Sequence, residues 1–159
     1  MGAEARLAEL GITVPEVVPP VAAYQPAART GNLVFTAGQL PARDGEMLAI
    51  GKLGAEVSDE QGYECARQCA LNALAAVKAE IGSLDDITRV VKAVVFVAST
   101  PDFTGQPKVA NGASEFLAEV FGDAGKHARS AVGVTALPLD VPVEVELVVE
   151  VGQGVEVKG

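Results

Sequence analysis

The sequence is poor in aromatic and basic residues. Only 4% of its 159 residues are aromatic, none is Trp, and 12 Lys and Arg stand against 21 Asp and Glu, a formal net charge of −9. Proteins that bind a nucleic-acid backbone need a basic face and commonly stack aromatic side chains on bases. The composition therefore argues against a nucleic-acid partner, and against binding to an anionic membrane surface.

Cysteine, histidine and long apolar runs are also scarce. No run approaches the roughly 20 apolar residues that span a bilayer, and the opening MGAEARLAEL lacks the apolar segment of a signal peptide. Cys65 and Cys69 lie four residues apart in a helical pattern, with a single histidine and no further cysteine to complete a metal site. We therefore expect two core thiols, no metal, no membrane association and a cytoplasmic location.

The apolar residues that are present, mostly Ala, Val and Leu, follow helix and strand periodicities. A long helix is expected from Ser58, which has capping-box spacing to Gln61, to Gly82, and a second one from Pro107 to Gly122. Strands are expected at 22–24 on an edge, at 33–37 and 47–54 around the Asp44-Gly45 turn, at 90–99 in the centre, and twice within 127–151.

This order of elements, β-β-α-β-α-β-β, predicts one α+β domain over residues 1–159, with its core at about 21–152. Antiparallel connections dominate, and two helices cover one face of the sheet. The other face would remain uncovered. Because the strands carry apolar positions on both faces, we expect the chain to self-associate through that face.

The most informative stretch is HARSAVGVTALPLDVPVEVE, residues 127–146, which reads as two strands joined at Leu137-Pro138. In the first strand, Arg129 shares a face with the small residues at 131, 133 and 135. A guanidinium beside small side chains can donate a fork of hydrogen bonds to a carboxylate ligand. The alternative is a plain surface or interface ion pair between Arg129 and a glutamate. In the second strand, Glu144 and Glu146 lie on the face opposite the valines.

Other catalytic motifs are weak. The run from Gly122 to Lys126 has the wrong spacing for a phosphate-binding loop, and no Ser or Thr follows the lysine. Ser114 lies inside the second helix, which makes it a poor nucleophile, so a triad with His127 is only formally possible. Glu144 and Glu146, two residues apart on one strand, are expected to point to solvent together and not to form a glycosidase pair.

Four segments resemble the RidA/YjgF/UK114 family, the reactive-intermediate deaminases once labelled L-PSP endoribonucleases. They are GNLVFTAGQLP at 31–41, the run from Asn72 to Leu84, the run from Asp102-Phe103 to Asn111, and ARSAV with LP and VEVE within 128–146. The resemblance covers roughly residues 23–151. It implies a chorismate-mutase-like fold and a homotrimer with a central barrel and ligand clefts between subunits.

The resemblance also implies a reaction, the hydrolysis of enamine or imine intermediates such as 2-aminoacrylate to a 2-keto acid and ammonia, without metal or cofactor. Arg129 would hold the substrate carboxylate, and Glu144 would position or activate water. The further residues expected at the cleft are Tyr24, Gly38, Asn111, Ala131 and His127.

The sequence departs from the family pattern at three points. Ala37 stands where the family usually has Ser, Ala131 replaces a frequent Cys, and GDAGKHARS replaces the usual approach to the Ala-Arg-Ser run. Two other functions remain open. One is a non-catalytic trimer that senses a small acid through Arg129, and the other is a ribonuclease, which the acidic composition disfavours.

Overall fold

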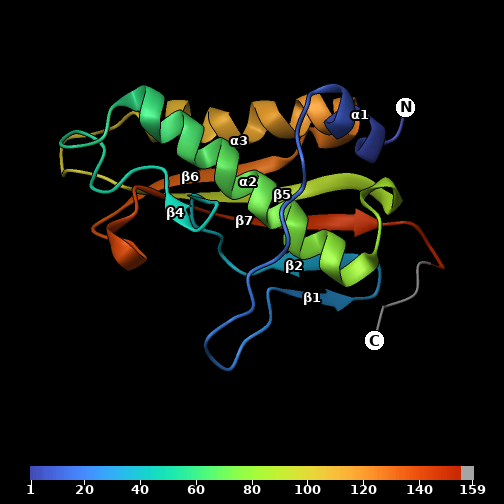
Figure 1. Cartoon of the computed structure of the whole chain (residues 1–159). Coiled ribbons are helices and arrows are strands. Elements are labelled where there is room, and N and C mark those ends of the chain that lie inside the picture. The colour runs from blue at the N-terminus through green and yellow to red at the C-terminus, as the bar shows by residue number, and fades with distance from the viewer. Residues whose placement is uncertain (155–159) are drawn as a thin grey trace.

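A five-stranded mixed sheet with two long helices on one face dominates the computed structural model, which describes residues 1–154 (Figure 1). The strand order is β1-β2-β7-β5-β6, and only β5 and β6 run parallel. The helices are α1 Ala3–Glu9, α2 Asp59–Ile81 and α3 Gln106–Phe121, with short 3₁₀ turns at Leu84–Asp86, Gly122–Gly125 and Pro138–Asp140. The strands are β1 Ala27–Thr30, β2 Leu33–Thr36, β3 Ala42–Arg43, β4 Glu46–Met47, β5 Ile87–Ala98, β6 Ala128–Val134 and β7 Val143–Val151.

The ends of the two long helices lie where their capping residues predict them. The Gln61 amide donates to Ser58 Oγ at 3.2 Å, and the Ser58 amide donates to Gln61 Oε1 at 2.9 Å, which completes the capping box of α2. Gly82 ends α2 with φ 93°, and Gly122 ends α3 with φ 61°, both left-handed conformations that favour glycine. The predicted helices and the α+β class are therefore confirmed.

The core lies between the sheet and the two long helices. The alternate residues of β7 from Val143 to Val151 are all buried, while the glutamates between them are partly exposed. Cys65 and Cys69 are buried and unpaired with each other, as expected. Burial raises the pKa of the Cys65 thiol to about 11, so this thiol stays protonated and behaves as a core side chain.

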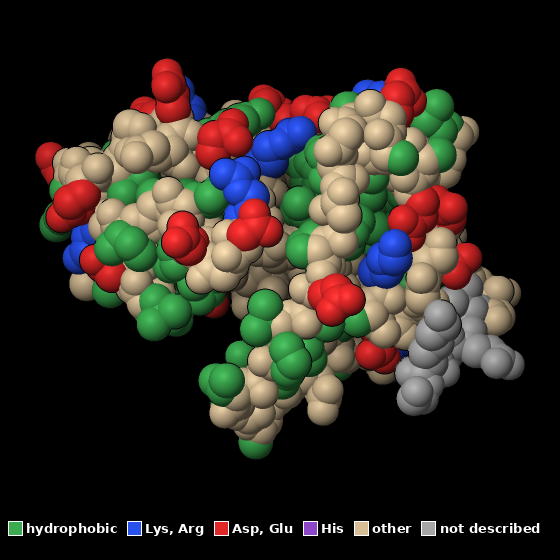
Figure 2. Space-filling view, viewed as in Figure 1, with side chains coloured by type: hydrophobic (Ala, Val, Ile, Leu, Met, Phe, Trp, Pro, Cys, Tyr) green, Lys and Arg blue, Asp and Glu red, His purple; other side chains and the backbone are tan. Residues whose placement is uncertain are grey.

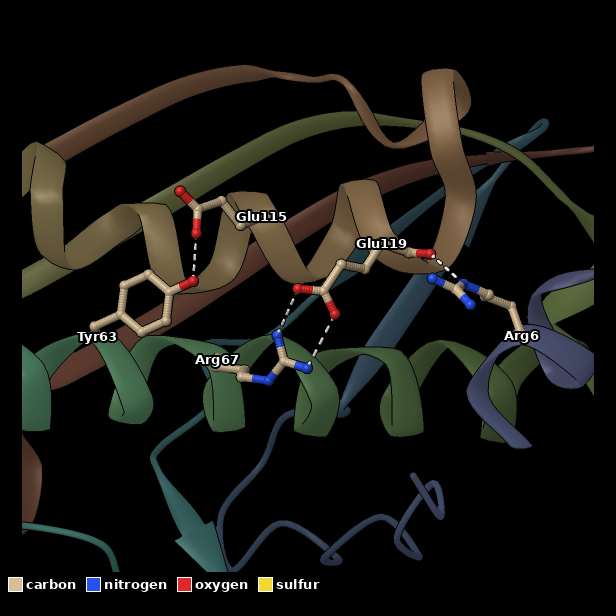
Figure 3. A network of polar contacts seen from close by, with 5 residues as sticks. All are labelled: Arg6, Tyr63, Arg67, Glu115 and Glu119. Atoms are coloured by element: carbon tan, nitrogen blue, oxygen red, sulfur yellow. Dashed lines mark hydrogen bonds and ion pairs between the residues drawn. The ribbon is translucent and has the colours of Figure 1, made fainter. Parts of the chain in front are cut away.

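Polar contacts on the outer side of the helix layer join α1, α2 and α3 (Figure 3). Arg67 pairs with Glu119 at 3.2 Å, and Arg6 Nε donates to the Glu119 carbonyl at 3.0 Å. The Tyr63 hydroxyl donates to Glu115, and this hydrogen bond raises the pKa of Tyr63 to about 12. These contacts hold α3 against α2 and α1.

Two strand predictions in the N-terminal half were wrong. Residues 22–24 form a bend, and the edge strand is β1, which begins directly after Pro26. The Asp44-Gly45 turn joins only the two-residue strands β3 and β4, and the strand expected at 47–54 does not form. Gly51 and Gly54 take φ angles of 113° and 87°, which a strand cannot accommodate. The neighbours of β2 are instead β1 and β7.

The sheet face away from the helices is uncovered in a single chain, as predicted. It carries exposed apolar side chains as well as the glutamates of β7. Phe35 is 42% exposed and Val132 is 44% exposed. Within residues 1–154, no helix is long and apolar enough to cross a membrane.

Candidate functional site

Arg129 lies on β6, at one edge of the sheet, and its side chain reaches α3. Its Nη1 donates to Asn111 Oδ1 at 2.8 Å and to Ser114 Oγ at 3.2 Å. Asn111 and Ser114 are three residues apart on α3, so they lie on the same side of that helix. In a single chain, no carboxylate between residues 1 and 154 lies within ion-pair distance of Arg129. A surface ion pair is therefore wrong for this part of the chain, whereas an ion pair across an interface between copies stays a hypothesis.

His127 joins this group through Ser114. Ser114 Oγ and His127 Nε2 are 2.9 Å apart, and His127 Nδ1 lies 2.7 Å from the carbonyl oxygen of Gly125. From the sequence, His127 is expected near Arg129, whereas Ser114 is considered only as a poor nucleophile. Its spacing of three residues from Asn111 on a predicted helix is the pattern that could have identified it as a second partner of Arg129.

The small residues that follow Arg129 on β6 lie on the same side of the sheet, as the alternation predicted. Ala131 packs against the hydrophobic core. A Cβ at Gly133 would lie 2.9 Å from Nε2 of Gln106, at the start of α3. The small side chains therefore allow α3 to approach β6 closely, and at Gly133 the space is occupied by this chain's own glutamine.

Glu144 lies on the uncovered face of the sheet, on β7, opposite Phe96 of β5. Its carboxylate packs against Gly38, because a Cβ at that position would lie 2.6 Å from Glu144 Oε1. Burial, and then the nearby charge of Glu146, raise the pKa of the Glu144 carboxyl. A carboxylate with a raised pKa is a stronger base, which suits the activation of a water molecule.

The expected site residues thus form two groups that one chain does not bring together. The arginine group, Arg129 with Asn111, Ala131 and His127, lies where β6 meets α3. The glutamate group, Glu144 with Gly38, lies on the uncovered face of the sheet.

Tyr24 belongs to neither group within one chain. It is 54% exposed and precedes β1, which forms the sheet edge opposite β6. The segment that contains it, coloured blue in Figure 1, projects below the body of the molecule, as the space-filling view in Figure 2 also shows.

Comparison with known proteins decides the family. The family model described as "YjgF/chorismate_mutase-like, putative endoribonuclease" matches residues 4–151. The chain belongs to the YjgF/RidA family. The chorismate-mutase-like fold that the resemblance implied is therefore confirmed.

Relatives of the family match the chain over most of its length. Protein TCP17 of Trypanosoma cruzi is 44% identical over 147 residues, 92% of each chain. A 2-iminobutanoate/2-iminopropanoate deaminase of Dermatophagoides farinae is 31% identical over 140 residues, 87% of this chain and 93% of that protein. The crystal structure of Atu1372 from Agrobacterium tumefaciens, 43% identical, superposes with a TM-score of 0.88 over 94% of this chain and 92% of that one. The YjgF/RidA family thus includes imine deaminases, and its fold extends over nearly the whole chain.

Proposed function

We propose that this protein hydrolyses 2-imino acids, or their enamine forms, to 2-keto acids and ammonia, in clefts between the copies of a homotrimer. The observation that carries the proposal is the state of Arg129. This partly buried cation has only neutral oxygens as partners among residues 1–154. A sheltered cation without a counter-charge is a binding site for a small carboxylate. The family relationship to a 2-iminobutanoate/2-iminopropanoate deaminase supports the same substrate class.

Arg129 holds the substrate by its carboxylate. Nη1 is engaged by Asn111 and Ser114, while Nη2 and Nε have no hydrogen-bond partner among residues 1–154. Two donors on one edge of a planar guanidinium match the two oxygens of a carboxylate. This pairing fixes the position of the neighbouring C=N carbon, which is the reacting atom.

Glu144 of a neighbouring copy supplies the base. It accepts a proton from water as the water oxygen bonds to the C=N carbon, and the electron pair of the C=N bond moves to nitrogen. The carboxylic acid then returns this proton to nitrogen, which gives a carbinolamine. The Glu144 carboxylate next takes the proton of the new hydroxyl and passes it to the same nitrogen, the electron pair of that O–H bond forms the keto group, and the C–N bond breaks with release of ammonia. The raised pKa of Glu144 favours these transfers, because the group is a better base and still a competent acid.

The second copy is required by the placement of the two groups. A neighbour that covers the apolar side chains Phe35 and Val132 also covers the face that carries Glu144. Light scattering of the purified chain is expected to give about three times 16.3 kDa. A stable monomer at micromolar concentration would remove the shared cleft and the proposal with it.

A coupled assay tests the reaction. An amino-acid oxidase or a dehydratase generates the imine, and the release of keto acid is timed with and without the protein. Glu144→Gln should slow the release by about 10²–10⁴-fold, the usual contribution of a general base, because an amide cannot accept the proton. Glu150→Gln, which removes a carboxylate on the same face of β7, is the matched control and should leave the rate unchanged.

Two outcomes would overturn the reaction or its assignment to Glu144. If the wild-type chain releases keto acid no faster than buffer does, the protein is a carboxylate-binding trimer and not an enzyme. If His127→Ala stops turnover and Glu144→Gln does not, the base is His127, which lies two residues from Arg129.

A further inference from the structure

Within the proposed site, and resting on the proposed function, we infer that His127 is a positioning residue for Arg129. It acts through the Ser114 hydroxyl and does not touch the substrate. The geometry that carries this inference is a continuous hydrogen-bonded chain from the Gly125 carbonyl through His127 and Ser114 to the Arg129 guanidinium.

The direction of each hydrogen bond in this chain follows from its first member. The Gly125 carbonyl oxygen can only accept, so His127 Nδ1, 2.7 Å away, carries a hydrogen and donates it. In a neutral imidazole, Nε2 is then an acceptor, and the Ser114 hydroxyl 2.9 Å away donates to it. With its single hydrogen directed at His127, Ser114 Oγ presents lone pairs to Arg129 Nη1. His127 thereby makes Ser114 an acceptor for the arginine.

The chain is anchored to rigid backbone. Gly125 is buried, and a Cβ there would lie 2.2 Å from the carbonyl oxygen of Leu117 on α3, so the loop packs directly on the helix. The carbonyl that orients His127 therefore keeps a fixed position relative to Ser114, which is on the same helix. No side chain larger than glycine fits at this contact, which accounts for the glycine two residues before His127.

The consequence for Arg129 is a fixed guanidinium plane. Asn111 and Ser114 accept from the same nitrogen, at 2.8 Å and 3.2 Å, and two acceptors restrict rotation of the group. Without His127, the Ser114 hydroxyl is free to turn its hydrogen away from the imidazole position, and Nη1 keeps Asn111 as its one secure partner. The free edge of the guanidinium then loses its orientation toward a carboxylate.

The test uses the full-length protein and 2-ketobutyrate as the probe ligand, with binding measured by calorimetry. Ser114→Ala and His127→Ala should each weaken binding roughly tenfold, the range for a hydrogen bond to a charged group. The double variant should weaken it by the same roughly tenfold and not a hundredfold, because both residues act through one chain. In the imine assay, the loss should fall on KM with kcat little changed.

Two variants separate positioning from a general structural effect. His127→Gln retains an acceptor that can reach Ser114 and should recover most of the affinity that His127→Ala loses. Lys126→Ala, next to His127, removes a cation whose side chain is 75% exposed and pairs with Asp123, and should bind as wild type does. If His127→Ala binds normally, if the two alanine effects add, or if His127→Gln is no better than alanine, the inference fails.

Arg129→Ala distinguishes this failure from a failure of the proposed function. If Arg129→Ala abolishes 2-ketobutyrate binding while Ser114→Ala and His127→Ala leave it intact, Arg129 does bind the carboxylate and only the role of His127 is wrong. If Arg129→Ala itself binds 2-ketobutyrate as wild type does, the proposed function is wrong, and the positioning role fails with it.

Discussion

Arg129 and Glu144 lie on opposite faces of the same sheet. In the strand register, Arg129 is the neighbour of Ala93 on β5, and Glu144 is the neighbour of Phe96 on the same strand. Residues three apart on a strand point to opposite faces, and no register shift falls between them. In the proposed mechanism, Arg129 and Glu144 of one chain therefore cannot act on the same substrate molecule, and each cleft would take the two residues from different copies.

This arrangement predicts complementation between two inactive variants. Arg129→Ala and Glu144→Gln should each be inactive alone, yet trimers assembled from an equal mixture should recover roughly a quarter of the wild-type rate, because a cleft with both native groups then forms by chance. The measurement is imine hydrolysis after co-expression or joint refolding. Mixed trimers that remain inactive would contradict a cleft shared between copies.

The arginine should be sensitive even to the substitution that keeps its charge. Arg129→Ala is expected to abolish binding of pyruvate or 2-ketobutyrate, a loss of about 1.5–3 kcal/mol for a charge-assisted pair. Arg129→Lys should also bind poorly, since an ammonium lacks the planar fork. Calorimetry checks both, with circular dichroism to show that the fold is intact. Wild-type affinity in the alanine variant would show that the anchor lies elsewhere.

Gly38→Ala should impair catalysis without affecting the binding of the carboxylate by Arg129. The added Cβ would lie 2.6 Å from Glu144 Oε1, so the flexible carboxylate must move aside. Misplacing a reacting group by about 1 Å can slow a reaction by about 10²-fold. We expect slower imine hydrolysis with nearly normal 2-ketobutyrate binding. Unchanged turnover would mean that the position of the Glu144 carboxylate is not important.

Glu144→Gln should stabilise the protein at neutral pH. A carboxyl whose pKa is raised in the folded chain holds its proton more tightly when folded, so the stability of the wild type falls as pH rises above the ordinary value of 4.5. The glutamine variant avoids this loss, and we expect a gain of roughly 1–3 °C in Tm at pH 7 that shrinks below pH 4. Thermal melts at both pH values measure it, with Glu150→Gln correcting for the loss of one charge. A lower Tm for Glu144→Gln at pH 7 would show that a cation of another copy compensates the buried charge.

Local features of this fold could be predicted because their causes are local. The capping box of Ser58 and Gln61 and the terminal Gly82 define a helix from residues that are adjacent in the chain. Strict alternation along β7 separates buried valines from Glu144 in the same way. The four family segments added the fold that the comparisons confirm.

Strand pairing in the N-terminal half could not be predicted, because it depends on contacts between distant residues. The Asp44-Gly45 turn correctly indicated a hairpin, but the positive φ angles of Gly51 and Gly54 prevent its second strand from extending. The place of β2 is decided instead by β7, more than 100 residues away in the chain. Periodicity contains no information about which of several apolar strands will be the neighbour.

The sequence by itself determined the α+β class, the family, the buried thiols and the residue types of the candidate site. Only the tertiary structure decided that Ser114 and His127 lie behind Arg129, and that Glu144 points away from it. The physical reason is that side-chain alternation fixes faces within one strand, whereas the relation between two strands depends on their register with β5, and the reach of α3 toward β6 depends on packing.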